Sequence, residues 1–399
     1  MKVLQVNSVC GQGSTGKIAV DLAKVLEQNG DECLIAYGRS TAPQGVNSVQ
    51  ISKDVWVKWH GALSRMTDRQ GFYSKKASQK LIKVIREYQP DLIQLHNLHG
   101  YYLHIPSLFQ FLAEAQVPVV WTLHDCWPFT GHCAYFDYAG CDKWKTLCKH
   151  CPQKKRYPKS LLWDASAKNY RQKKEWFGSV NNMTIVTPSQ WLAGLVKQSF
   201  LGGCPVQVIP NGIDLTVFRP TESEFRSRYG LENKVIVLGV ANSWDYRKGL
   251  DAFRQLAACL DDSFRIVLVG INQKQAAELS NNMIAIKKTK NQQELAQIYT
   301  AADVFINPTL EDNFPTTNLE ALACGTPVIT YQTGGSGESI TPQCGAVVEK
   351  GNIDALIKAI HETRCISRDV CLDRASSYEK GKRFQEYIQL YQKILKEKE

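Results

Sequence analysis

Residues 307–329 read NPTLEDNFPTTNLEALACGTPVI. The apolar run Val304–Asn307 predicts a buried strand that ends where this string begins, and Thr317–Ala323 has the spacing of a short helix. Gly325-Thr326-Pro327 stops that helix and leads into a second apolar run, Pro327–Tyr331. A strand, an acidic loop, a helix and a second strand are the repeating unit of a parallel sheet covered by helices.

The same alternation extends outward through both halves of the chain. The further predicted strands are Val3–Val9, Cys33–Tyr37, Leu92–His96, Val117–Leu123, Met183–Thr187, Val235–Val240 and Arg265–Val269. The further predicted helices are Lys17–Gln28, Lys75–Tyr88, Leu250–Leu260 and Gln292–Thr300. The pattern restarts after Pro210-Asn211-Gly212, so two doubly wound domains explain it better than one long sheet.

The predicted fold class is α/β, with two Rossmann-like domains. The first spans residues 1–208 and carries a cysteine-rich insertion at about 126–160, and the second spans residues 209–380. Residues 381–399 are amphipathic and predict a helix that packs back on the first domain. Ligands of open α/β sheets bind beyond the carboxyl ends of the strands. Two such domains facing each other would make a deep cleft with one substrate on each side.

Composition indicates an ordinary globular protein with an anionic partner. Apolar residues make up 44% of the chain and charged residues 22%. No apolar run reaches the roughly 18 residues of a membrane-spanning helix. The first residues lack the apolar core of a signal peptide, so we expect a cytoplasmic protein that can also work at the inner face of the membrane. The net charge of +10 fits an anionic ligand or an anionic membrane surface.

Basic and aromatic residues gather between residues 154 and 177. They can form a solvated helix face with core aromatics, or a membrane-surface patch whose cations meet anionic headgroups. Nucleic acid is not an expected partner, because no RNP, zinc-finger or helix-turn-helix signature is present. The residues are Lys154, Lys155, Arg156, Lys159, Lys168, Arg171, Lys173 and Lys174, with Tyr157, Trp163, Tyr170, Trp176 and Phe177.

A glycine-rich segment follows the first predicted strand. Gly11–Lys17 fits the pattern GxxxxGK, but Ile18 stands where a P-loop needs a hydroxyl to bind Mg²⁺. An ATPase is therefore not expected. Backbone amides at the start of a helix still bind anions, so the segment is a candidate phosphate contact. Its candidate residues are Gly13, Ser14, Thr15 and Gly16.

The string quoted first resembles the donor-binding signature of family 4 glycosyltransferases, which are retaining enzymes of the GT-B fold. That signature reads E-G-F-P…E-A-x-A-x-G-x-P-V-I. The matching residues are Phe314, Pro315, Glu320, Ala321, Ala323, Gly325, Pro327, Val328 and Ile329. Asp312 stands where the first glutamate is expected and Asn313 where the glycine is. Glu311 lies one place early, so either acid can fill the first acidic position.

Shorter motifs extend the resemblance over most of the chain. Val208–Asp214 looks like the family's interdomain V-I-P-N-G-V-D, and Thr333–Glu338 resembles its T-G-G-x-x-E. Arg247-Lys248-Gly249 resembles the E-K-G turn, whose lysine meets the donor diphosphate. Ser243 stands where the family usually has an arginine. His124-Asp125 resembles the family's H-D, whose histidine faces the transferred sugar.

The resemblance implies retaining transfer of a hexose-type sugar from a UDP- or GDP-linked donor, without a catalytic metal. His124, Lys248 and Asp312 are the catalytic candidates that it implies. Cations and backbone amides would stabilise the leaving diphosphate, and Glu320 would bind the ribose. The candidate donor contacts are Gly13, Ser14, Thr15, Gly16, Arg247, Lys248, Glu311, Asp312, Asn313, Phe314, Pro315, Thr316, Thr317, Asn318, Leu319 and Glu320.

Four cysteines follow the His-Asp pair. Cys148 and Cys151 have the spacing of a zinc knuckle, and Cys133 and Cys141 would complete a tetrahedron, although the other gaps are not those of standard zinc fingers. Structural zinc, disulfides and free thiols all stay open. The insertion resembles that of transferases that build capsular or exopolysaccharide repeat units of the colanic-acid type, and we expect it to shape the acceptor side.

The acceptor is the least specified part of this interpretation. We expect a sugar linked to a lipid diphosphate at the inner membrane face. A small soluble acceptor is an alternative within the enzymes. A non-catalytic protein that only binds nucleotide sugars is a third possibility, because Asp312 replaces a glutamate and one arginine is missing.

Overall fold

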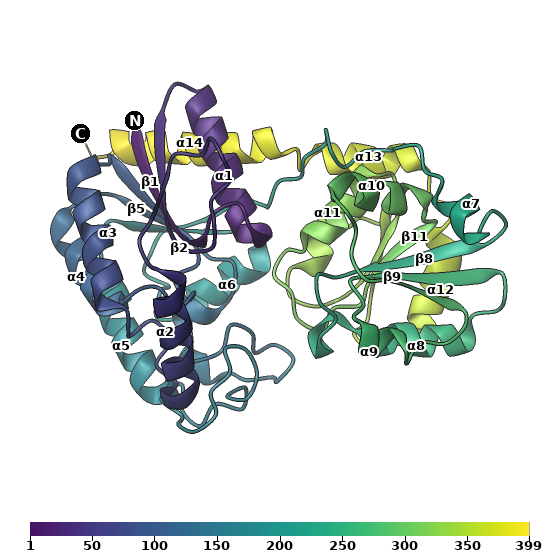
Figure 1. Ribbon diagram of the computed structural model, residues 1–399, viewed down its shortest axis with the longest axis horizontal. Helices are drawn as coiled ribbons and strands as arrows, with labels where there is room; N and C mark the ends of the chain where they lie inside the picture. The colour runs from purple at the N-terminus through teal and green to yellow at the C-terminus, as the bar shows by residue number, and fades with distance from the viewer. Residues whose placement is uncertain (399) are drawn as a thin grey trace. The chain divides into compact units, whose positions relative to one another are not determined.

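The chain folds as two compact α/β units, described over residues 1–398 by a computed structural model (Figure 1). Residues 1–209 and 384–398 form the N-terminal unit, and residues 210–383 form the C-terminal unit. Each unit holds a parallel sheet with helices packed on its two faces. The predicted pair of doubly wound domains is therefore confirmed. Within residues 1–398, no helix combines the length and the apolar composition needed to cross a membrane.

The N-terminal sheet has seven strands in the order β3-β2-β1-β4-β5-β6-β7. Their order reverses between β1 and β4, so the loops that follow these two strands diverge from one point at the carboxyl edge. The strands are β1 (Lys2–Val9), β2 (Glu32–Arg39), β3 (Ser48–Gln50), β4 (Leu92–Leu95), β5 (Val119–Thr122), β6 (Met183–Thr187) and β7 (Val206–Val208).

Two cores cover the two faces of this sheet. Leu4 of β1 shares one core with Leu81 of helix α3 (Lys75–Tyr88). Its neighbour Val3 shares the other core with Leu22 of α1 (Gly13–Gln28) and Ile388 of α14 (Lys380–Lys396). Adjacent residues of a strand point to opposite faces, and both faces of this sheet are covered. The central strands are therefore apolar at nearly every position, which is why they could be predicted from the sequence. The helices are α1 (Gly13–Gln28), α2 (Asp54–Thr67), α3 (Lys75–Tyr88), α4 (Ile105–Ala115), α5 (Ser166–Gly178) and α6 (Gln190–Gln198), with short 3₁₀ turns η1 (Trp127–Phe129) and η2 (Lys143–Lys145).

The C-terminal helix α14 (Lys380–Lys396) lies for most of its length in the N-terminal unit, beside α1 (Figure 1). Tyr387 accepts a hydrogen bond from Thr122 Oγ1 at 3.2 Å, and Tyr391 donates one to Gln94 Oε1 at 2.8 Å. Both partners lie on central strands. The two phenols therefore satisfy polar groups inside the core, as buried groups require.

The C-terminal sheet has six strands in the order β10-β9-β8-β11-β12-β13, with its reversal between β8 and β11. Its strands are β8 (Val235–Val240), β9 (Phe264–Val269), β10 (Met283–Ile286), β11 (Val304–Asn307), β12 (Val328–Tyr331) and β13 (Gly345–Val348). Its helices are α7 (Phe225–Tyr229), α8 (Leu250–Cys259), α9 (Gln273–Ala276), α10 (Gln292–Ala301), α11 (Thr316–Ala323), α12 (Ile353–Thr363) and α13 (Arg368–Ser376), with 3₁₀ turns η3 (Tyr246–Lys248) and η4 (Ser336–Ser339).

The structure corrects the predicted start of the first helix. The prediction began it at Lys17, but α1 begins at Gly13, so the glycine-rich segment is the first helical turn and not a separate loop. The amides of a first turn have no partner inside the helix. The side chain of Gln12, the N-cap residue, makes no hydrogen bond to them. The segment therefore still presents N–H groups, now with the orientation of a helix start.

The structure also divides the basic and aromatic segment at residues 154–177. Tyr170 and Phe177 of α5 lie in the core, and Lys173 is buried, with Nζ donating to the carbonyls of Trp127 at 2.7 Å and Thr130 at 3.1 Å. Burial lowers the pKa of Lys173 to about 7. The α5 part of the segment thus fits the solvated helix face with core aromatics, whereas the membrane-surface alternative stays a prediction.

Candidate active site

The acidic string lies at the switch point of the C-terminal sheet. The loop after β8 runs into η3, which carries Arg247 and Lys248, and the loop after β11 carries Glu311, Asp312 and Asn313. β8 and β11 are neighbours whose connections diverge, and such a point is where open α/β sheets bind their ligands. Two motifs far apart in sequence therefore meet at one edge of one sheet.

Direct contacts join the basic turn to the acidic loop. Lys248 Nζ donates to Asp312 Oδ2 at 2.7 Å, and the two side chains are 27% and 16% exposed. The carbonyl of Arg247 accepts hydrogen bonds from the N–H of Leu310 at 2.7 Å and from Thr309 Oγ1 at 3.2 Å. The ion pair is thus fixed by the backbone on both sides, while Lys248 remains accessible to a ligand from solvent.

Arg247 provides a second cation on the same turn. Its Nη2 lies 3.4 Å from Asp245 Oδ2, and Asp245 Oδ1 accepts the backbone N–H of Arg247 at 2.9 Å. Asp245 therefore caps the turn and orients the guanidinium. Ser243, where the family usually has an arginine, is exposed and adds no charge.

Two glycines allow the loops to approach so closely. Gly249 has φ +73°, and a Cβ at this position would overlap the carbonyl oxygen of Pro308. Gly334 has φ +53°, and its Cβ would overlap the carbonyl oxygen of Asp312. Both conformations favour glycine, and any side chain would push the acidic loop away from its neighbours.

Helix α11 begins beside this loop and offers an anion-binding end. Pro315 is its N-cap and makes no side-chain hydrogen bond to the first turn. The amides there and the positive end of the helix dipole suit a phosphate group. In the next turn, half-buried Glu320 accepts a hydrogen bond from Tyr299 OH at 3.1 Å, which orients its carboxylate.

The two acids that compete for the first acidic position have different surroundings. Asp312 is half-buried and holds Lys248, whereas the Glu311 side chain on the same loop is only 1% exposed. Asp312 therefore lies nearer to any ligand that enters from solvent. This placement distinguishes the two acids, which sequence position alone left equivalent.

Several predicted donor contacts have side chains committed to the interior. Asn318 is fully buried, accepting from Asn307 Nδ2 at 2.8 Å and donating to the carbonyl of Ser336 at 2.9 Å. Phe314 and Leu319 belong to the core, and Asn313 and Pro315 are buried as well. Thr316 and Thr317, in the first turn of α11, are half-buried. The buried residues shape the loop and its backbone amides.

The switch point of the N-terminal sheet carries the glycine-rich turn. Gly13 and Ser14 are exposed, Thr15 is half-buried and Gly16 is buried. The N–H of Gly11 donates to the carbonyl of Gly16 at 3.0 Å and closes the turn against the end of β1. The exposed amides therefore stand at the edge where the loop after β4 also emerges.

A histidine pair lies at that edge. His124 follows β5 and His96 follows β4, with His124 Nε2 at 3.2 Å from His96 Nδ1 and His96 Nε2 at 2.9 Å from Gln5 Oε1. Burial lowers the pKa of His124 to about 4 and that of His96 well below its ordinary value, so both rings are neutral at neutral pH. Because Gln5 Oε1 accepts, His96 Nδ1 must accept from His124 Nε2–H. His124 can bind a hydroxyl but carries no charge.

Asp125 forms a second buried pair beside it. Its Oδ2 lies 2.8 Å from His99 Nε2, and its Oδ1 accepts the N–H of Trp127 at 2.9 Å. Burial alone would raise the pKa of Asp125, but the charge and hydrogen bond of His99 keep it below its ordinary value. The prediction missed His96 and His99. Their signal was the sequence LHNLHG at 95–100, directly after a strand that neighbours the His-Asp strand.

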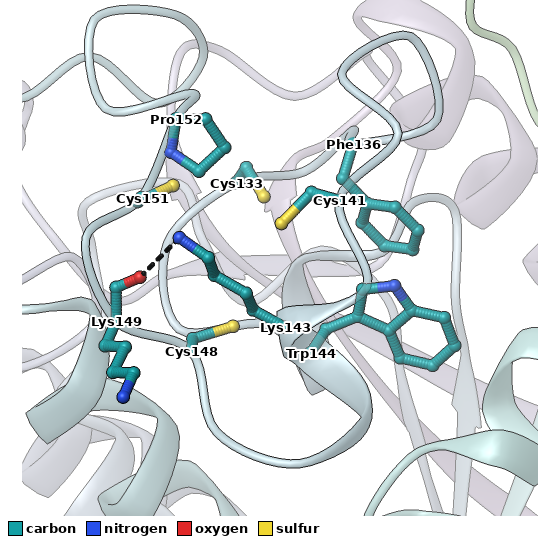
Figure 2. A pocket seen from close by; sticks show the side chains of 9 residues that line it. All are labelled: Cys133, Phe136, Cys141, Lys143, Trp144, Cys148, Lys149, Cys151 and Pro152. Atoms are coloured by element: carbon teal, nitrogen blue, oxygen red, sulfur yellow. Dashed lines mark hydrogen bonds between the residues drawn. The ribbon is translucent and has the colours of Figure 1, made fainter.

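Four cysteine thiols point toward one small pocket in the insertion, as Figure 2 shows for Cys133, Cys141, Cys148 and Cys151. All four are free thiols, and a hydrogen bond with Cys133 lowers the pKa of Cys151 to about 7. Across the described residues, no three His, Cys, Asp or Glu side chains already have a metal-binding arrangement. The proposed zinc site stays a prediction.

Both halves of the chain match known family models. Residues 15–217 match glycosyltransferase family 4, and residues 221–363 match the glycosyl transferases group 1. The first match covers half of the 399 residues. The chain belongs to glycosyltransferase family 4. The family expected from the acidic string is thereby confirmed.

Relatives of this family 4 chain act in glycan assembly. It is 27% identical to the Escherichia coli K12 glycosyl transferase WcaC, provisionally assigned to colanic acid biosynthesis, over 90% of both chains. It is 25% identical to a Campylobacter jejuni N,N'-diacetylbacillosaminyl-diphospho-undecaprenol alpha-1,3-N-acetylgalactosaminyltransferase, over 46% of this chain and 53% of that one. The Anabaena Alr3699/HepE structure with UDP-glucose has a TM-score of 0.68 at 15% identity, covering 98% of this chain and all of the other. These likenesses confirm the GT-B fold.

Proposed function

We propose that this enzyme transfers a hexose-type sugar from a UDP- or GDP-linked donor, with retention of the anomeric configuration. The contact of Lys248 with Asp312 carries the proposal, because it holds a cation at the switch point, against the loop that leads into α11. A diphosphate needs such a cation and the backbone amides of a helix start. The UDP-glucose held by the Anabaena protein supports this donor class.

The proposed chemistry follows from the charges that bond cleavage creates. The bond between the anomeric carbon and the diphosphate oxygen breaks, which leaves negative charge on the diphosphate and positive character on the sugar. Lys248, Arg247 and the amides of residues 316–318 and 13–16 stabilise the diphosphate. Neutral His124 hydrogen-bonds a hydroxyl of the sugar, and Glu320 accepts hydrogen bonds from the ribose.

Retention then needs no carboxylate nucleophile. The leaving diphosphate takes the proton of the acceptor hydroxyl and guides that oxygen to the face that it has just left. Asp312 takes part by holding Lys248 against the diphosphate. Because two side-chain cations supply the positive charge, we propose that transfer continues when a chelator removes divalent metal ions.

The proposed acceptor is a sugar linked to a lipid diphosphate, used at the inner face of the cell membrane in cell-surface polysaccharide assembly. The assignments of two relatives support this class, since one is provisionally assigned to colanic acid biosynthesis and the other is a transferase of a diphospho-undecaprenol sugar. A small soluble acceptor is the second candidate. Transfer to water-soluble sugars without any lipid would favour it.

A donor screen tests the proposal. Thermal unfolding is measured with UDP- and GDP-linked hexoses, and a ligand at a hundred times its Kd should stabilise the chain by about 2.7 kcal/mol. Labelled sugar transfer from the selected donor follows, with Glu320→Ala as the test variant and Glu362→Ala, at an exposed position of α12, as its control. We expect loss of donor stabilisation only in Glu320→Ala. Stabilisation without any transfer or hydrolysis would instead indicate a non-catalytic binding protein.

A further inference from the structure

Helix α2 turns its large apolar side chains toward solvent. Trp56, Trp59, Leu63 and Met66 recur at spacings of three and four, so they share one face of the helix. They are between 38% and 61% exposed. The buried face is narrow and consists of Val57, His60, Gly61 and Ser64, with His60 Nδ1 at 2.7 Å from Ser74 Oγ. This is the reverse of an ordinary surface helix, which buries its apolar stripe.

A loop far away in sequence extends that apolar face. Leu161, Leu162 and Trp163 are between 53% and 68% exposed. The N–H of Leu161 donates to the carbonyl of Arg65 at 2.7 Å, and the N–H of Trp163 donates to that of Met66 at 3.2 Å. These carbonyls belong to the last turn of α2 and have no partner inside the helix. The loop therefore closes the helix end and stands beside it, as Figure 1 also shows for α2 and the loops before α5.

Cations border this apolar face. A groove of about 790 Å³ opens beside α2 and is lined by Trp56, Trp59 and Tyr73. Four of its described lining residues are lysines and none is an acid; the lysines are Lys53, Lys75, Lys76 and Lys80. Indoles next to ammonium groups match the boundary of an anionic bilayer, where acyl chains begin below phosphate headgroups.

We propose that this surface binds an anionic phospholipid bilayer. We call it the α2 surface, and it consists of Trp56, Trp59, Leu63, Met66, Leu161, Leu162 and Trp163. Contiguous exposed apolar side chains mark an interaction site, and the lysines at the rim select a negatively charged one. This binding would deliver the enzyme to a lipid-linked acceptor, and that role rests on the proposed function. The binding itself needs neither donor nor acceptor.

Flotation of the full chain with vesicles tests the inference. We expect it to float with vesicles of equal phosphatidylglycerol and phosphatidylcholine and much less with phosphatidylcholine alone. Combined Trp56→Ser, Trp59→Ser and Trp163→Ser should weaken binding at least about tenfold. Lys53→Gln and Lys76→Gln should each weaken binding to the anionic vesicles about fivefold. Added salt should also weaken this binding, because it screens the lysine charges.

Matched controls keep surface binding separate from folding. Tyr229→Ser and Lys288→Gln remove an exposed aromatic and an exposed lysine of the C-terminal unit, and neither should change flotation. Brominated acyl chains should quench the fluorescence of the unmodified chain more than that of the tryptophan variant. Equal flotation of the unmodified chain and the tryptophan variant would overturn the inference, as would no binding to either vesicle.

The outcomes also distinguish this inference from the proposed function. Vesicle binding in a chain that neither binds nor transfers a nucleotide sugar would leave the α2 surface in place and remove the function. Donor-dependent transfer in a chain that ignores anionic vesicles would do the opposite. Retained donor stabilisation in the tryptophan variant would show that it folds.

Discussion

Replacing Lys248 by methionine removes one charge from the proposed donor site and keeps most of the side chain's apolar stem. Lys248 and Asp312 are 27% and 16% exposed at 2.7 Å. A partly exposed ion pair contributes about 1 kcal/mol or less to the free energy of unfolding. The glycine contacts and backbone hydrogen bonds that hold both loops stay intact in Lys248→Met. We therefore expect urea unfolding to change little.

The effect on transfer should be far larger. Removing one group that stabilises charge in the transition state costs about 2.7–4 kcal/mol, or roughly a hundredfold to a thousandfold in rate. Lys248→Met also leaves the Asp312 carboxylate facing the diphosphate, and like charges about 4 Å apart repel by about 4 kcal/mol at an effective dielectric constant near 20. Adding Asp312→Asn removes that repulsion, so the double variant should recover part of the lost rate.

The assay follows transfer of labelled sugar from the donor chosen by thermal shift, in parallel with urea unfolding. Lys358→Met is the matched control, because it breaks an exposed ion pair with Glu362 (3.8 Å) in the same unit. We expect it to leave transfer unchanged. A Lys248→Met chain that transfers as fast as the unmodified chain refutes the role of Lys248. A double variant slower than Lys248→Met refutes the account of Asp312.

Three further predictions test other parts of the structure. Burial lowers the pKa of His60 to about 3 and of His124 to about 4, from an ordinary 6.5. The unfolded chain therefore binds more protons below pH 6.5, and stability should fall as the pH drops from there toward 4, by about 1.4 kcal/mol per pH unit for each such histidine. Urea unfolding of His60→Gln should show a shallower loss, and an unchanged slope would contradict the assignment. Gly249→Ala should destabilise the chain by more than about 1 kcal/mol and weaken donor binding. Gly351→Ala, with φ +81° but open space around its Cβ, is the control, and equal effects would exclude a special contact with Pro308. Metal analysis should find stoichiometric zinc that Cys151→Ser loses and Cys365→Ser keeps, whereas a zinc-free and fully active chain would end that prediction.

Burial explains which strands the sequence revealed. The predicted strands β8, β11 and β12 are central, with most residues hidden on both faces, so they read as continuous apolar runs. The edge strands of both sheets went unpredicted. These edge strands are β3, β7, β10 and β13. They are short and partly exposed, and the pattern of their residues does not distinguish them from loops.

The candidate site divides in a similar way between local and distant contributions. The string at 307–329 lies on one β-loop-α unit, so its motif could be recognised without tertiary structure. The partners that position its side chains come from elsewhere. Tyr299 on α10 reaches Glu320, and His96 after β4 reaches His124 after β5. Such contacts depend on strand order, which periodicity does not specify.

Helix α2 shows how a periodic pattern can be present and still be misleading. Apolar residues at 56, 59, 63 and 66 have the spacing of a helix, but the usual rule would place that stripe in the core. The rule fails here because the inward face is already committed. His60 bonds Ser74, Thr67 Oγ1 lies 2.7 Å from Tyr73 OH, and Asp68 at the helix end accepts the N–H of Ala165 at 2.8 Å. These polar contacts and the buried Val57 fix the helix to the protein, so the larger apolar stripe faces solvent. The exposed tryptophans and the neighbouring lysines are therefore the two observations on which the proposed binding to an anionic bilayer rests.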